Sequence, residues 1–139
     1  GLGTNLTASF LCCQKIRHGV LERRLGRIKL IGSIAGRTPP RVAGAAYTTS
    51  KAALSGCLRS LITTLHGSGV TANLVAPGHI ATAMTDSPDS DQIALSHIPV
   101  GRVGTPADVA ALIGFLVSED AGFINGATID VNGGEFIPL

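Results

Sequence analysis

The strongest constraint on the fold is the order of secondary structure predicted along the 139 residues. Apolar side chains recur at spacings of three and four in residues 4–24 and 47–66, which is the period of an amphipathic helix. Short β-rich runs are found at 28–33, at 70–76 and within 127–134. With a third helix expected after residue 105, helices and strands alternate, which predicts a parallel sheet with helical crossovers, an α/β layered fold.

Residues 79–104 form the longest predicted loop, with room for one short helix, and loops of this length inside compact domains are usually functional. The loop ends at a predicted helix start. Thr105 can cap the helix, Pro106 suits its first turn, and Asp108 follows the cap by three residues. No linker divides the sequence, so residues 1–139 are predicted to belong to one domain.

The composition argues against several classes of partner. The formal charge is +2 with scattered basic residues, and there are one Tyr, four Phe and no Trp, so no nucleic-acid surface is predicted. No apolar run approaches the roughly 20 residues that cross a bilayer, and no leader opens the chain, so we expect a cytoplasmic chain without membrane contact.

The three cysteines do not have the paired spacing of a zinc site, and no metal site is predicted. Cys12, Cys13 and Cys57 are expected to be reduced thiols of a cytoplasmic protein. Cys13 and Cys57 are predicted to pack as small hydrophobic residues.

The only tyrosine is the most informative position for chemistry. Tyr47 stands four residues before Lys51, so on a helix the two side chains share a face one turn apart. A phenol is a poor proton donor or acceptor at neutral pH unless a cation stabilises its anion, and Lys51 can supply that cation. The same spacing also occurs on surface helices without a function.

Two further segments directly follow predicted strands. Ser33 ends the first strand, where its hydroxyl could bind a substrate oxygen or only cap the turn. APGHIAT (76–82) follows the second strand, where Pro77 and Gly78 let the backbone approach a ligand and Thr82 offers a hydroxyl. Taken alone, this segment is also consistent with a simple turn.

Taken together and in this order, these residues resemble the short-chain dehydrogenase/reductase family of NAD(P)-dependent oxidoreductases. The resemblance covers nearly the whole chain and is carried by the segments NLTASFLCCQ, GRIKLIGSIAG, YTTSK, GVTANLVAPGHIAT and PVGRVGTPADVAALIGFLVSEDAGFINGATIDVNGG. The part from IPVGRVG onward most resembles the 3-oxoacyl-acyl carrier protein reductase type.

The resemblance implies four catalytic residues. Tyr47 would protonate the carbonyl oxygen, and Lys51 would favour the tyrosine anion and hold the ribose hydroxyls of the nicotinamide cofactor. Ser33 would polarise the substrate carbonyl. Asn5 would hold a water against Lys51, although without the resemblance a helix cap would be the better interpretation of Asn5.

The resemblance also implies cofactor and partner contacts. Pro77, Gly78, Ile80 and Thr82 would line the nicotinamide of NADP or NAD, with NADP slightly favoured, and residues 84–97 would form a mobile substrate lid. Family members commonly pair through helices equivalent to 4–24 and 47–66, and through the last helix and strand, so a homo-oligomer is expected.

The chain departs from the family by lacking the strand, Gly-rich turn and helix that bind the cofactor pyrophosphate. We therefore expect the carboxyl-terminal half of a Rossmann-type, doubly wound parallel sheet, three strands of seven, with the nucleotide-binding half preceding Gly1. The first strand would then have an open edge, and the isolated chain would be inactive and prone to aggregate. Lys29 on that strand must extend its amine to solvent or find a partner.

Three functions remain open at this stage. The leading hypothesis is hydride transfer between a nicotinamide cofactor and a carbonyl or secondary alcohol, with a 3-oxoacyl thioester as the substrate to be reduced. A second is a non-catalytic association module. A third keeps the reaction type and changes the substrate to a sugar, polyol or steroid alcohol.

Overall fold

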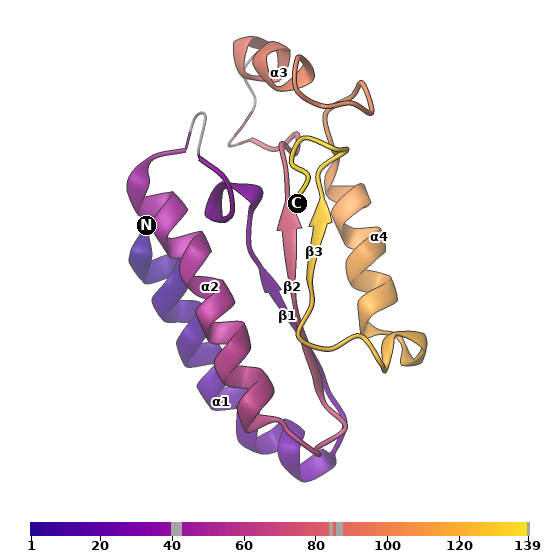
Figure 1. Ribbon diagram of the computed structural model, residues 1–139. Helices are drawn as coiled ribbons and strands as arrows, with labels where there is room; N and C mark the ends of the chain where they lie inside the picture. The colour runs from indigo at the N-terminus through magenta and orange to yellow at the C-terminus, as the bar shows by residue number, and fades with distance from the viewer. Residues whose placement is uncertain (40–42, 84, 86–87, 139) are drawn as a thin grey trace.

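Three parallel strands form the centre of the computed structural model, which describes residues 1–39, 43–83, 85 and 88–138. The strands β1 (Arg27–Ile31), β2 (Thr71–Pro77) and β3 (Thr128–Val131) lie in the order β1-β2-β3. Both pairs are parallel, with Leu30 opposite Leu74 and Val75 opposite Ile129. Helices lie on both sides of the sheet (Figure 1), so the predicted α/β layered fold is confirmed.

The helical segments follow the predicted order. They are a π-helical turn at Gly3–Thr7, α1 (Ala8–Arg23), a 3-10 turn at Ile34–Gly36, α2 (Ala45–Thr64), α3 (Pro88–Leu95), α4 (Pro106–Val117) and a 3-10 turn at Glu119–Ala121. The short helix expected within the loop 79–104 is thus present as α3. Within the described residues, no helix is long and apolar enough to cross a membrane.

Two predicted strands are shorter than the sequence indicated. β1 ends at Ile31 rather than Ser33, because Ser33 caps the 3-10 turn that follows, its side chain accepting a hydrogen bond from the Ala35 amide. β3 ends at Val131, because Gly133 and Gly134 have φ angles of 61° and 88° that turn the chain away from the sheet.

The alternation of side chains along each strand distributes the core over the two faces of the sheet. On one face Ile28, Leu30 and Leu74 pack against α1 and against the leucine stripe of α2, which includes Leu54 and Leu58.

On the other face Val75, Ile129 and Val131 pack with Leu116 of α4. Because β2 is covered on both faces, its residues 71–76 are all buried.

Two of the cysteines belong to the core, as predicted. Cys13 of α1 is buried in the cluster between α1, α2 and the sheet, and Cys57 of α2 packs against the same cluster. Burial raises the pKa of the Cys13 thiol. All three cysteines are free thiols.

β1 has a strand on only one side among the described residues, so the predicted open edge is present. Lys29 lies on this strand, and its Nζ atom is buried without a hydrogen-bond partner in the described part of the chain. Burial lowers the pKa of Lys29, and the charge of Arg27 lowers it further. The expectation that Lys29 reaches solvent or a partner is therefore wrong within the described residues, because β1 holds the amine inside the fold.

Candidate functional site

The first turns of α2 bring together the two side chains that the YTTSK segment predicted to be neighbours. Lys51 follows Tyr47 by one helical turn, and its Nζ atom lies 5.7 Å from the centroid of the Tyr47 ring. Within the described residues, the Tyr47 hydroxyl has no hydrogen-bond partner. The phenol is thus available to another molecule and lies within reach of a positive charge.

The ammonium of Lys51 is held in place by the end of β1. Its Nζ donates a hydrogen bond of 2.9 Å to the Ile31 carbonyl oxygen, which leaves two of its three N–H groups for other acceptors. Lys51 is half-buried, and this desolvation lowers its pKa. This contact joins residues 20 positions apart, and no local pattern in the sequence indicates it.

Ser33 follows β1 by two residues and carries a hydroxyl with an unused proton. Its Oγ accepts a hydrogen bond of 3.1 Å from the Ala35 amide, so the turn-capping role considered for this serine is present. Among the described residues the same hydroxyl donates to no acceptor. Capping therefore orients the side chain and leaves its proton free to bind an oxygen atom of a ligand.

Gly36 lets the Ser33 turn pack directly against α2. A Cβ atom at Gly36 would lie 2.7 Å from the Ala52 amide nitrogen and 2.8 Å from the Lys51 carbonyl carbon, closer than real Cβ atoms approach backbone. Only glycine therefore permits this separation between the Ser33 turn and the helix segment that carries Lys51. No local pattern in the sequence singles out Gly36, because nothing local distinguishes a turn glycine from one that a distant helix requires.

Asn5 lies in the π-helical turn before α1 and contacts α2. Its Nδ2 donates a hydrogen bond of 3.2 Å to Ser50 Oγ. Ser50 directly precedes Lys51 in the sequence and is fully buried. The alternative interpretation of Asn5 as a helix cap is wrong, because the first turns have no side-chain cap. Single π-helical turns are frequent at functional sites. A water between Asn5 and Lys51 stays a prediction.

The residues expected to line a nicotinamide lie at the carboxyl end of β2 and in the loop that follows it. Pro77 ends the strand, Ile80 forms an isolated parallel bridge with Gly104, and Thr82 Oγ1 lies 3.3 Å from Thr85 Oγ1.

Gly78 donates its amide to the Val131 carbonyl, and a Cβ there would lie 2.7 Å from Asn132 Cβ. Packing against the end of β3 therefore requires this glycine even without a ligand. Of the expected lid, residues 84, 86 and 87 lie outside the described residues, and α3 makes up most of the rest.

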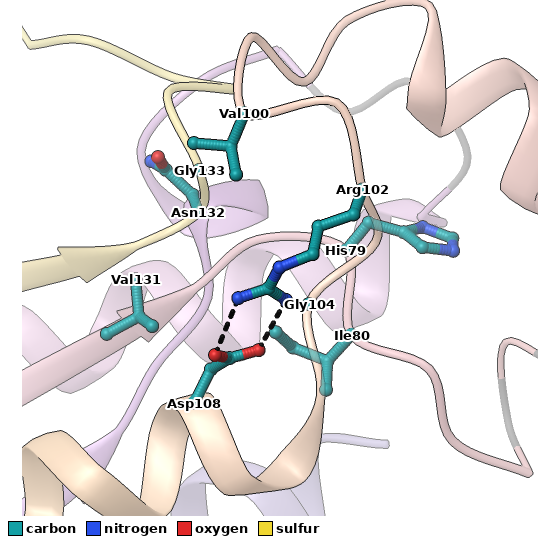
Figure 2. Close-up of a pocket in the computed structure, with 9 residues that line it drawn as sticks. All are labelled: His79, Ile80, Val100, Arg102, Gly104, Asp108, Val131, Asn132 and Gly133. Carbon is teal, nitrogen blue, oxygen red and sulfur yellow. Dashed lines mark hydrogen bonds and ion pairs between the residues drawn. The ribbon is translucent and has the colours of Figure 1, made fainter.

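A pocket of about 160 Å³ lies on the α4 side of this loop (Figure 2). Arg102 donates two hydrogen bonds of 2.8 Å to the Asp108 carboxylate, which lower the pKa of Asp108 below its usual range. The residues that line this pocket are His79, Ile80, Val100, Arg102, Gly104, Asp108, Val131, Asn132 and Gly133. Because its charged groups pair with each other and it includes only Ile80 of the expected site residues, the candidate site lies instead on the α2 side.

The residues present fit one end of a dinucleotide. Two free N–H groups of Lys51 suit ribose hydroxyls, and the loop 77–82 lies at the carboxyl end of β2, where parallel sheets bind ligands. The described residues contain no strand that leads through a Gly-rich turn into a helix, the structure that binds a pyrophosphate.

A parallel Rossmann-type sheet with a serine after one strand and a tyrosine–lysine pair on the following helix defines a class of α/β oxidoreductases. The profile of the family described as enoyl-(acyl carrier protein) reductase matches residues 2–135. The chain belongs to the short-chain dehydrogenase/reductase family.

Two 3-oxoacyl-acyl carrier protein reductases are among the similar proteins. The 3-oxoacyl-[acyl-carrier-protein] reductase MabA of Mycobacterium tuberculosis is 43% identical over 136 residues, which are 96% of this chain and 54% of that protein. A 3-oxoacyl-[acyl-carrier protein] reductase of Brucella melitensis with bound NAD superposes with a TM-score of 0.90 at 32% identity, over 96% of this chain and 50% of that one.

The acetoin dehydrogenase YohF of Salmonella typhimurium superposes with a TM-score of 0.82 at 35% identity, over 96% of this chain and 53% of that one. The chain thus spans about half the length of the relatives that it matches.

Proposed function

We propose that these residues form the catalytic half of an NAD(P)-dependent oxidoreductase that interconverts a carbonyl group and a secondary alcohol, and that it reduces a 3-oxoacyl thioester. The observation that carries the proposal is the Lys51 ammonium, 5.7 Å from the Tyr47 ring, next to the Ser33 turn. The similarity to 3-oxoacyl-[acyl-carrier-protein] reductases supports the choice of substrate.

Tyr47 moves the proton of the reaction. In the direction of reduction its hydroxyl donates a proton to the carbonyl oxygen, and in the direction of oxidation its phenolate accepts that proton from the alcohol. The Lys51 ammonium stabilises the phenolate electrostatically, because it is held by the Ile31 carbonyl at one turn from Tyr47.

Ser33 and Lys51 position the reactants. The Ser33 hydroxyl donates a hydrogen bond to the carbonyl oxygen of the substrate, which polarises the carbonyl group and fixes its orientation. The two remaining N–H groups of Lys51 bind ribose hydroxyls, and the loop with Pro77, Gly78, Ile80 and Thr82 lines the ring. When bound, a nicotinamide cofactor supplies the hydride. We propose NADP rather than NAD on the family resemblance, although one similar structure holds NAD.

The exposed surface of α1 supports a homo-oligomer. Phe10, Leu11 and Ile16 expose 46%, 52% and 44% of their surface, which leaves apolar side chains of α1 for contact with a second copy. If the full-length protein runs as a monomer in light scattering at micromolar concentration, this part of the proposal is wrong.

The test of the proposed chemistry is Tyr47→Phe in the full-length protein that carries these residues. Reduction of an acetoacetyl thioester with NADPH should fall by about a hundredfold or more, because one hydroxyl is removed and the ring is kept. Thr49→Val is the matched control, since Thr49 is an exposed residue of the same helix, and its activity should stay unchanged. Activity of Tyr47→Phe at the parent rate would contradict the proposal.

A second substrate class is favoured by the superposition on the acetoin dehydrogenase YohF, since acetoin is a small hydroxyketone. The same residues would then act on a small polar alcohol, such as a sugar or polyol, or on a steroid alcohol. A panel of acetoacetyl thioester, acetoin, sugar, polyol and steroid substrates decides between them through the ranking of kcat/KM.

A further inference from the structure

Helix α3 stands apart from the sheet and from the other helices, at the end of the molecule to which the strands point (Figure 1). Ile93 and Leu95 on this helix expose 53% and 42% of their surface. Among the described side chains, one hydrogen bond joins α3 to another segment, and it is formed by His79 Nε2 and Asp91 Oδ1 at 2.9 Å. This contact therefore adds a directional bond to the packing of the buried Ala94 of α3.

The His79 end of the contact is held firmly. The His79 amide donates a hydrogen bond of 2.9 Å to the Glu135 carboxylate, and its carbonyl accepts one of 3.0 Å from the Gly104 amide. The side chain is only 14% exposed, and it points away from the Arg102–Asp108 pair (Figure 2). The His79 backbone is thus held in place, and its largely buried imidazole is the group to which α3 is attached.

The Asp91 end is more open. The Asp91 side chain is 38% exposed, and its carboxylate can accept a hydrogen bond from a protonated Nε2 of the imidazole. His79 follows β2 by two residues, inside the loop with Pro77, Gly78, Ile80 and Thr82. The contact therefore connects the loop proposed to line the nicotinamide with the helix proposed to cover the substrate.

We propose that His79 is a positioning residue for substrate binding, which holds Asp91 and thereby keeps α3 beside the carboxyl ends of the strands. This inference rests on the proposed function for the identity of the ligand. The contact itself can be tested without that function, because the position and opening of α3 are measurable in the absence of any substrate.

The test compares His79→Phe, Asp91→Asn and the double variant with the full-length parent protein. Hydrogen–deuterium exchange of the amides at 91–98 should become about fivefold faster in each single variant, and the double variant should be no faster than either. KM for acetoacetyl thioester should rise by about fivefold, with kcat changed by less than about twofold. Asp91→Glu, which keeps a carboxylate, should restore part of the protection.

Two exposed residues supply matched controls, His66→Phe for the imidazole and Asp120→Asn for the carboxylate, and both should behave as the parent. Unchanged exchange at 91–98 in the single variants, or effects that add in the double variant, would overturn the inference. So would faster exchange with an unchanged KM, because α3 would then move without affecting the substrate. If the parent reduces none of the substrates in the panel, the proposed function fails, and the exchange arm still decides whether His79 holds α3.

Discussion

At the scale of single residues, the position of the Ser33 hydroxyl depends on the absence of a side chain at Gly36. The 3-10 turn at Ile34–Gly36 packs so closely on α2 that a methyl group would overlap the backbone at Lys51 and Ala52. Displacements of about an ångström cost large factors in rate when reacting groups must align. Ser33 and Lys51 are therefore positioned with respect to each other through this backbone contact, together with the hydrogen bond from Lys51 Nζ to the Ile31 carbonyl.

We expect Gly36→Ala in the full-length protein to lower kcat/KM for acetoacetyl thioester by at least about tenfold, because the Ser33 turn must move away from α2. Gly44→Ala is the matched control. Gly44 has a φ of −70°, and a Cβ there would have nothing within 4 Å, so the activity should be close to that of the parent. Parent-like kcat/KM for Gly36→Ala would show that the close approach does not position the catalytic groups.

The same scale separates what the sequence could predict from what it could not. The proximity of Tyr47 and Lys51 follows from helical geometry alone, so their spacing of four residues was sufficient to predict it. The pair of Arg37 with Asp130 joins residues 93 positions apart, and the Arg37 guanidinium also lies 5.2 Å from the Phe136 ring centroid. Such contacts depend on how whole elements pack, so they cannot be predicted from a local sequence pattern.

At the scale of elements, the start of α4 shows how several local signals combine. Thr105 and Asp108 form the predicted capping box, with Pro106 in the first turn. Arg102 adds two hydrogen bonds to the same carboxylate, which the sequence analysis did not anticipate. These contacts keep the pKa of Asp108 below its ordinary value of 3.8, so the cap stays ionised at a more acidic pH than a free carboxyl group would.

Because the pKa of Asp108 is lower in the folded than in the unfolded chain, its carboxylate stabilises the fold above the unfolded value, and this contribution is lost as the pH falls through the folded value. We expect Asp108→Asn to lower the urea midpoint of unfolding at pH 7, and the difference from the parent to shrink as the pH is lowered below about 4.

Asp120→Asn, an exposed control in the 3-10 turn after α4, should show no such difference. A gap between Asp108→Asn and the parent that stays constant from pH 7 to pH 3 would contradict the role of the ionised cap.

At the scale of the whole molecule, the layers and the order of the strands followed from the alternation of helix and strand. The ends of β1 and β3 did not, because capping by Ser33 and the positive φ angles of Gly133 and Gly134 set them. The described residues offer groups for the nicotinamide end of a cofactor and none for a pyrophosphate. Cofactor binding therefore distinguishes the catalytic proposal from a non-catalytic association module.

We expect the 139-residue chain on its own to bind no NADPH at micromolar concentration, whereas the full-length protein binds it. The measurement is a titration followed by nicotinamide fluorescence, with NADH as the second ligand. Full-length Tyr47→Phe is a suitable control, because it should keep binding while losing activity. Binding by the 139-residue chain alone would contradict the assignment of the pyrophosphate site to other residues, and would also exclude the association module.

The outer edge of β1 also bears on how such a protein is made. A strand edge without a neighbour pairs with whichever strand arrives first, whether that strand is tethered to the same chain or belongs to another copy. A tethered strand competes at an effective concentration of roughly millimolar, far above that of separate chains in dilute solution. A covalently connected strand is therefore expected to pair with β1 before a strand of another copy does. After a cut in the backbone before β1, the extent of each pairing would depend on the protein concentration.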